Sequence, residues 1–170
     1  MKKIIFIIIF LGFNQYLAAE LPYYLDFKQI LNESEAGKKA QNILKKKLDN
    51  GLASISKREK SLQDEEKKII SQKKIISAEE YKKKVTELRG KVGKLQKDRN
   101  NLLKDISSQR AKARNELLKN LNPIIKDYMI EKKIRFVIDK KSLILADEKL
   151  DITKDIINIL NSKLKEIKLN

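Results

Sequence analysis

The chain has 170 residues and a formal net charge of +16, with 36% charged and 6% aromatic residues. It contains no cysteine and no histidine. Disulfides, thiolate metal sites and a thiol nucleophile are therefore excluded, and the usual general base and the commonest metal ligand are missing. This composition is typical of a protein built from long helices, and it argues against an enzyme.

Residues 1–19 have the layout of a secretory signal peptide, in which two lysines precede the apolar run 4–13 and small residues end the segment at Ala19. An apolar helix of that length rises only about 15 Å, whereas the hydrocarbon core of a membrane is roughly 30 Å thick. We therefore expect cleavage after Ala19 and an exported mature chain that begins near Glu20. An uncleaved N-terminal anchor is the alternative.

The mature chain stays strongly basic, because the loss of two lysines with residues 1–19 lowers the charge from +16 to +14. A charge of this size attracts anionic partners. Inside a cell the default partner would be nucleic acid. Export argues against nucleic acid and favours anionic lipid, lipopolysaccharide or an acidic polypeptide. Solubility alone is the simpler explanation for part of the excess charge.

Residues 21–27 are aromatic and typical of a short strand. Pro22 lacks an N–H group, so it fits only the first residue or the edge of such a strand. A helix is predicted to follow, with Asn32 or Ser34 as its N-cap.

The segment from residue 34 to residue 122 has a helical apolar pattern and no proline. One series of residues spaced seven apart consists of Leu48, Ile55, Leu62, Ile69 and Ile76. A second series alternates steps of four and three and consists of Tyr81, Val85, Leu88, Val92, Leu95, Arg99, Leu102, Ile106, Gln109 and Ala113. Such heptads are typical of helices that wind around one another.

Between the two series, Ser77 and Glu80 form a capping box that restarts a helix. This restart favours two antiparallel helices, each about 60 Å long, over one continuous rod. The tip of the hairpin is expected near residues 71–80.

Beyond the arm the composition changes, and Pro123 is expected to kink or end the second helix. Residues 134–139 and 142–146 are predicted to form two strands joined by a tight turn, the second of them buried on both faces. A last amphipathic helix is expected to begin at a cap, either Asp151 or Thr153. Three short strands and one helix bury little area, so this body is expected to self-associate.

The sequence resembles the Skp (OmpH-like) family of periplasmic chaperones over essentially the whole mature chain. The resemblance rests on the order and spacing of short segments around the arm, namely Tyr24-Leu25-Asp26, Ser34-Glu35-Ala36-Gly37-Lys38, Phe136-Val137-Ile138-Asp139 and Asp151-Ile152-Thr153. Pro22 departs from the residue usual in the family, which bears on how fully the first strand pairs.

The resemblance implies an α+β fold that is mostly α. A helical hairpin arm, residues 34–122, would project from a β-rich body formed by residues 20–33 and 123–170. Three such bodies would join in a central barrel, with the arms hanging around a cavity. In this trimer the expected body core consists of Tyr24, Phe136, Ile138, Leu143 and Leu145.

The resemblance further implies a holdase in the periplasm that needs no ATP or other cofactor. It would bind unfolded outer-membrane proteins between its arms and prevent their aggregation before membrane insertion. A structural coiled-coil tether of the cell envelope is the alternative. Catalysis is not expected, because Asp26, Asp139 and Asp151 fall where strand ends and helix caps explain them. Gly90 and Gly93 lie within the heptad run and do not form a phosphate-binding loop.

The predicted tip is the most basic part of the arm, because residues 67–84 contain seven lysines and two glutamates, a local charge of +5. The lysines proposed to contact anionic lipid or lipopolysaccharide are Lys73, Lys74, Lys82, Lys83 and Lys84. Each lysine near an anionic membrane surface contributes about 1 kcal/mol. A solvated helix face is the simpler alternative.

Overall fold

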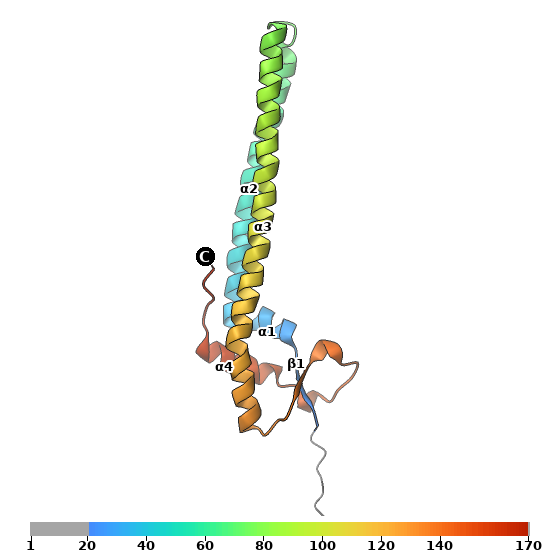
Figure 1. Ribbon diagram of the computed structural model, residues 1–170, viewed down its shortest axis with the longest axis vertical. Coiled ribbons are helices and arrows are strands. Elements are labelled where there is room, and N and C mark those ends of the chain that lie inside the picture. Colours follow the sequence, from blue (N-terminus) through green and yellow to red (C-terminus); the bar gives the residue numbers. More distant parts are fainter. Residues whose placement is uncertain (1–20, 170) are drawn as a thin grey trace, which may run out of the picture.

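The computed structural model describes residues 21–169 as a long two-helix arm on a small body (Figure 1). The predicted signal peptide and its cleavage site lie outside these described residues. The predicted helices and strands all lie within them. The body gathers both ends of the described chain around the foot of the arm.

The arm is an antiparallel pair formed by α2 (Glu35–Gln72) and α3 (Ala78–Glu131). Each helix begins at the serine that the sequence indicated. The Ser34 hydroxyl accepts a hydrogen bond from the Gly37 N–H at 3.2 Å, and the Ser77 hydroxyl accepts one from the Glu80 N–H at 3.2 Å. The hairpin and its tip are therefore confirmed, and the single continuous rod is wrong.

The heptad series form the seam between α2 and α3. Ile55, Ile69 and Leu95 are buried, whereas Val92 and Arg99 remain exposed. Ion pairs between the two helices accompany the seam along its length and join Lys47 to Asp105 at 2.7 Å, Arg58 to Asp98 at 2.8 Å and Lys91 to Glu65 at 2.6 Å. These pairs match the antiparallel register that the apolar residues set.

The polar seam position Gln109 is buried and has its own partner. Its Nε2 donates to both carboxylate oxygens of Asp105, at 2.9 and 3.0 Å. The Lys47 ammonium, and after it the Gln109 amide, hold the pKa of the Asp105 carboxyl below its usual range. A buried amide with a satisfied donor is tolerated in such a seam and disfavours other pairings of the two helices.

The sheet in the body is smaller than expected. It consists of β1 (Tyr23–Leu25) and β2 (Val137–Asp139), which pair in parallel with Tyr24 opposite Ile138. A single further bridge joins Tyr24 to Asp151. Two of the three predicted strands exist but are three residues long, and β1 starts directly after Pro22.

The predicted strand 142–146, with burial on both faces, is wrong for this chain. The Asp139 carboxylate accepts a hydrogen bond from the Lys141 N–H at 3.1 Å and starts the 3-10 turn Lys140–Ser142, which turns the chain out of the sheet. A second 3-10 turn, Glu148–Leu150, follows. Between the two turns Ile144 and Leu145 are exposed.

A short helix that the sequence did not indicate, α1 (Phe27–Glu33), follows β1 directly. Asp26 caps it, because its carboxylate accepts a hydrogen bond from the Gln29 N–H at 2.8 Å. Phe27, predicted to be the last strand residue, is therefore the first residue of a helix. Ser34 then adopts an extended conformation that separates α1 from α2.

Pro123 was expected to kink or end the helix, and an end there is wrong, because α3 continues to Glu131. A proline inside a helix costs about 3 kcal/mol. Two neighbours hold the helix in place, since Leu121 is fully buried and Ile124 nearly so. Their packing against the body offsets the cost of the proline.

The last helix, α4 (Thr153–Lys163), lies across the foot of the arm. Its N-cap position is Ile152 and not Asp151 or Thr153, although the Asp151 carboxylate accepts a hydrogen bond from the Thr153 N–H at 2.9 Å. The body core lies between α1, the foot of α3 and α4. Its buried residues include Ile30, Leu117, Leu121, Ile156 and Leu160.

Candidate functional site

The sheet has two faces, and the core of the chain covers only one of them. Leu25 belongs to the buried core, and Val137 packs against it. Side chains alternate along a strand, so Tyr24 and Ile138, which are opposite each other in the register, belong to the other face. Two of the predicted trimer residues therefore lie on this second face.

The predicted trimer residues differ in burial within the single chain. Tyr24 is covered, with the Lys140 ammonium 6.0 Å from its ring centre, and Ile138 and Leu143 are half-buried. Phe136 is 49% exposed and Leu145 is 92% exposed. Among the described residues, none of the five belongs to the buried core cluster. Four of the five, all except Tyr24, are apolar residues of the body that stay partly or largely exposed, and so does Ile144. We call this set of residues the open face: Phe136, Ile138, Leu143, Ile144 and Leu145.

The tip of the arm brings the predicted basic residues together at the turn between α2 and α3. Lys73 and Lys74 lie in this turn, and Lys82, Lys83 and Lys84 lie on the first turns of α3. Two isoleucines that the lipid hypothesis did not include are also exposed there, Ile70 at 58% and Ile75 at 81%.

The tip lysines are not equivalent. The Lys84 ammonium donates to Gln72 at 2.9 Å and pairs with Glu80 at 3.5 Å, and it is half-buried. The Lys73 ammonium lies 5.8 Å from the centre of the Tyr81 ring. Within residues 21–169, Lys74, Lys82 and Lys83 form no ion pair. Lys84 therefore shapes the tip, whereas the other four lysines remain available to an outside anion.

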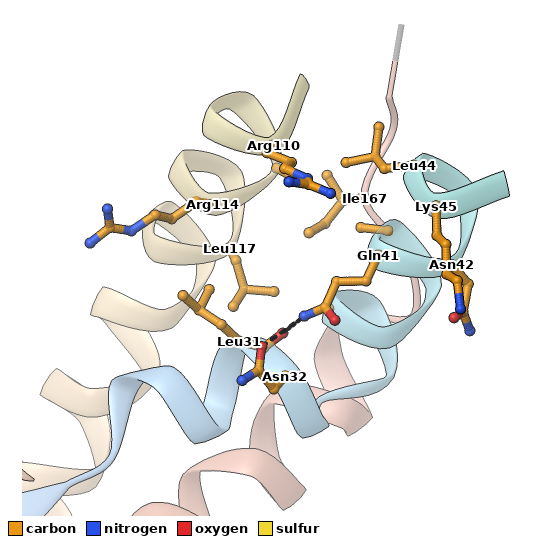
Figure 2. A pocket seen from close by; sticks show the side chains of 13 residues that line it. Leu31, Asn32, Gln41, Asn42, Leu44, Lys45, Arg110, Arg114, Leu117 and Ile167 are labelled. Carbon is orange, nitrogen blue, oxygen red and sulfur yellow. Dashed lines mark hydrogen bonds between the residues drawn. The ribbon is translucent and has the colours of Figure 1, made fainter. Parts of the chain in front are cut away.

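A pocket of about 440 Å³ lies at the foot of the arm, where α1, α2 and α3 meet the C-terminal segment (Figure 2). Its floor is apolar, and Arg110 and Arg114 of α3 are among the residues that line it. Figure 2 shows Ile167 of the C-terminal segment beside Arg110, whereas the Arg114 side chain extends away from Ile167. Neither arginine was singled out from the sequence. The sequence feature that could have indicated the pocket is the pair of small residues Ala40 and Ala113. Both are buried and line the pocket where the seam reaches the body.

The carboxylates that could suggest catalysis have structural roles, as predicted. Asp26 caps α1, Asp139 starts a 3-10 turn, and Asp151 accepts the Thr153 N–H. Across residues 21–169, no three acidic side chains are grouped so as to hold a metal ion.

The described structure thus defines an arm protein: a basic, two-helix coiled coil that projects from a small mixed body with an exposed apolar face. The sequence profile of the family described as Outer membrane protein (OmpH-like) matches residues 23–160. The chain belongs to this family, as the resemblance in its sequence indicated.

The fold has a counterpart among solved structures. The chain is similar to a candidate outer membrane chaperone (OmpH-like) from Caulobacter crescentus CB15, with a TM-score of 0.81 and 20% sequence identity. The similarity covers 88% of this chain and 90% of the other. At this identity the likeness establishes the arm-and-body fold. No curated protein sequence matches the chain. None of the helices within residues 21–169 is long and apolar enough to span a membrane.

Proposed function

We propose that this protein is a periplasmic holdase that works as a homotrimer without ATP and keeps unfolded outer-membrane proteins between its arms. The observation that carries the proposal is the open face of the body at the foot of a projecting arm. An apolar surface of this kind is unusual on a monomer and typical of an interface. Family membership agrees with the proposal, and so does the description of the Caulobacter protein as a candidate outer membrane chaperone.

Self-association through the open face would place three arms around one axis. The face combines Phe136, the residue directly before β2, with Ile144 and Leu145 of the loop after β2. Their exposure in the single chain leaves them free to pack against a second copy. Such an interface would add buried apolar area to a small body.

The arms would hold a client through many weak contacts. Ile43 at 51% and Leu103 at 47% are exposed apolar residues outside the seam. An unfolded outer-membrane strand alternates apolar and polar residues and aggregates through its exposed edges. Enclosure between arms raises the effective concentration of such contacts without fixing the structure of the client.

Native mass spectrometry tests the proposal, with the mature protein alone and after addition of an outer-membrane β-barrel protein diluted from urea. We expect a trimer that gains one client without nucleotide, and suppression of the light scattering that aggregation of the client produces. Leu145→Asn should dissociate the trimer, whereas Ile75→Asn, an equally exposed apolar residue at the tip, should not. A monomer that ignores the client would favour the envelope tether.

The composition of the tip favours a second contact, with an anionic membrane surface. Exposed lysines beside Ile70 and Ile75 suit a surface that offers both charge and an apolar interior. Vesicles of phosphatidylglycerol should bind the protein, and vesicles of phosphatidylcholine should not. Binding should be lost when the tip lysines are changed to glutamate, namely Lys73, Lys74, Lys82, Lys83 and Lys84.

A control variant makes the same change of charge on α3 below the tip, at Lys94, Lys97, Lys104, Lys112 and Lys119. If this variant loses vesicle binding to the same extent, total charge and not the tip is responsible. If the tip variant binds as well as the unchanged protein, the membrane contact is excluded.

A further inference from the structure

The pocket at the foot of the arm carries an excess of positive charge that the described chain does not neutralise. Lys45, Arg110 and Arg114 line it, and its lining includes no carboxylate. Within residues 21–169, Lys45, Arg110 and Arg114 form no ion pair, and the Arg114 guanidinium lies 5.9 Å from the centre of the Phe27 ring. The chemistry of the rim therefore fits an anion.

The floor of the same pocket fits an apolar group. Leu31, Leu44 and Leu117 surround it, and between them Ala40 and Ala113 are too small to fill the space. Its volume of about 440 Å³ lies within the range of roughly 300–1,000 Å³ that is common for ligand sites. A ligand that fits would be an anion attached to an apolar group.

The geometry places the two features within reach of one ligand. Figure 2 shows the Arg110 side chain extending towards Gln41 and Ile167, over the side of the pocket that Leu117 lines. A guanidinium in such a position can hold a carboxylate through paired N–H donors. Gln41 is already oriented, because its Nε2 donates to Asn32 Oδ1 at 2.8 Å and to the Leu31 carbonyl at 3.3 Å.

We propose that this pocket binds the free carboxyl terminus of an unfolded polypeptide. The terminal carboxylate would pair with Arg110, and the last apolar side chain would enter the floor beside Ala40 and Leu117. The Gln41 side-chain oxygen at the rim would accept a hydrogen bond from the peptide backbone. The physiological meaning of this site rests on the proposed function, because the polypeptide would then be the client.

The shape of the pocket favours a peptide end over a fatty acid. A pocket that sequesters a small apolar ligand usually buries about 70–90% of its surface. This pocket is open to solvent, so the rest of a longer chain can leave it. The Gln41 amide oxygen at the mouth would gain nothing from an aliphatic chain, whereas the N–H groups of a peptide backbone can donate to it.

Fluorescence anisotropy with the full mature protein tests the proposal. The probe is a fluorescein-labelled decapeptide that ends in Leu-Val-Ile with a free carboxylate, and its control is the same peptide with a terminal amide. We expect the free acid to bind about tenfold more tightly, as a charge-assisted hydrogen bond implies. Arg110→Gln should abolish this difference. Arg99→Gln makes the same change of charge on α3, about 16 Å away, and should preserve it.

Two outcomes would overturn the proposal. One is equal binding of the acid and the amide by the unchanged protein. The other is displacement of the peptide by decanoate together with an acid–amide difference that persists in Arg110→Gln. This result would assign the pocket to a fatty acid. Suppression of client aggregation is measured with the same variants. If the unchanged protein suppresses aggregation but shows no preference for the free acid, only the terminus-binding proposal fails, and the holdase proposal stands.

Discussion

The body and the arm bury their apolar residues in different ways. In the body, Ile30, Leu121 and Leu160 are each 0% exposed, because elements from both ends of the chain surround them. In the arm, Ile55, Ile69 and Leu95 lie in a single seam and stay 6–8% exposed. The difference teaches that the body contributes most of the stability of the chain. The arm is long and exposes much of its surface, so it buries fewer of its apolar residues completely.

The comparison is tested most directly by truncating one leucine in each region to alanine. Leu160→Ala should lower the free energy of unfolding by about 3–4 kcal/mol, because the surrounding helices cannot collapse into the cavity. Leu95→Ala should cost about 1–2 kcal/mol, because the seam is two helices wide and can relax. Urea unfolding followed by circular dichroism, at a fixed concentration of protomers, measures both values. Equal losses would contradict the comparison.

Two glycines test the same difference through close contacts. A Cβ atom at Gly37 would lie 2.1 Å from the Leu31 carbonyl oxygen, which is backbone and cannot move aside alone. Gly37→Ala should therefore destabilise the protein by about 2 kcal/mol. At Gly51 in the arm, the Cβ would lie 2.5 Å from a terminal methyl group of Leu102, which can rotate away. Gly51→Ala should cost less than about 1 kcal/mol in the same urea experiment. A larger loss at Gly51 than at Gly37 would show that the arm is the more rigid region.

The hydrogen bond between α3 and α4 makes the stability of the body depend on pH, which the arm can be compared with. The Tyr128 hydroxyl donates to Asp155 at 2.6 Å, and burial, followed by this carboxylate, raises the pKa of Tyr128 from 10.0 to about 12. The folded state keeps the proton that the unfolded state releases, so this contribution to stability is present below pH 10 and is lost as the pH rises towards 12.

Tyr128→Phe should lower the free energy of unfolding by about 1–2 kcal/mol at neutral pH. Its stability should also fall less than that of the unchanged protein between pH 10 and pH 12, a range set by the pKa of Tyr128. The unchanged protein is the reference because lysines titrate in the same range in both. Parallel curves would show that the hydroxyl does not titrate with folding.

The smallest expected effect is a gain in stability from a substitution in the arm. Gly90 has open space around the position of a Cβ atom. Gly90→Ala should stabilise the protein by about 0.5–1 kcal/mol, because alanine favours the helix. Gly93→Ala, where the space is also open, should give a similar gain. A loss at either position would mean that something outside the described chain packs there.

The arm could be predicted from the sequence because its cause is local. A repeat of apolar residues and two serine caps, Ser34 and Ser77, specify the hairpin, its seam and its tip. The body could be predicted only in part, since its strands pair across the whole chain. The apolar run 142–146 indicated a strand, yet the Asp139 turn directs it out of the sheet.

The two candidate sites, the basic tip and the pocket, also differ in how far the sequence could predict them. The basic tip is contiguous in the sequence, so its lysines could be found there. The pocket required the foot of α2, the foot of α3 and the C-terminal segment to meet, so Arg110 carried no signal by itself. The helix α1 was missed because seven residues with a single buried position, Ile30, are too few to show a helical period.

The pairing of β1 with β2 also bears on the order in which the molecule forms. Tyr23 pairs with Val137, a separation of 137 − 23 = 114 residues, and Tyr24 bridges to Asp151 still later in the chain. Contacts so distant in sequence form slowly, whereas the arm closes from its own tip through near neighbours. Folding therefore runs from the tip to the foot, and the body closes only when nearly the whole chain is available.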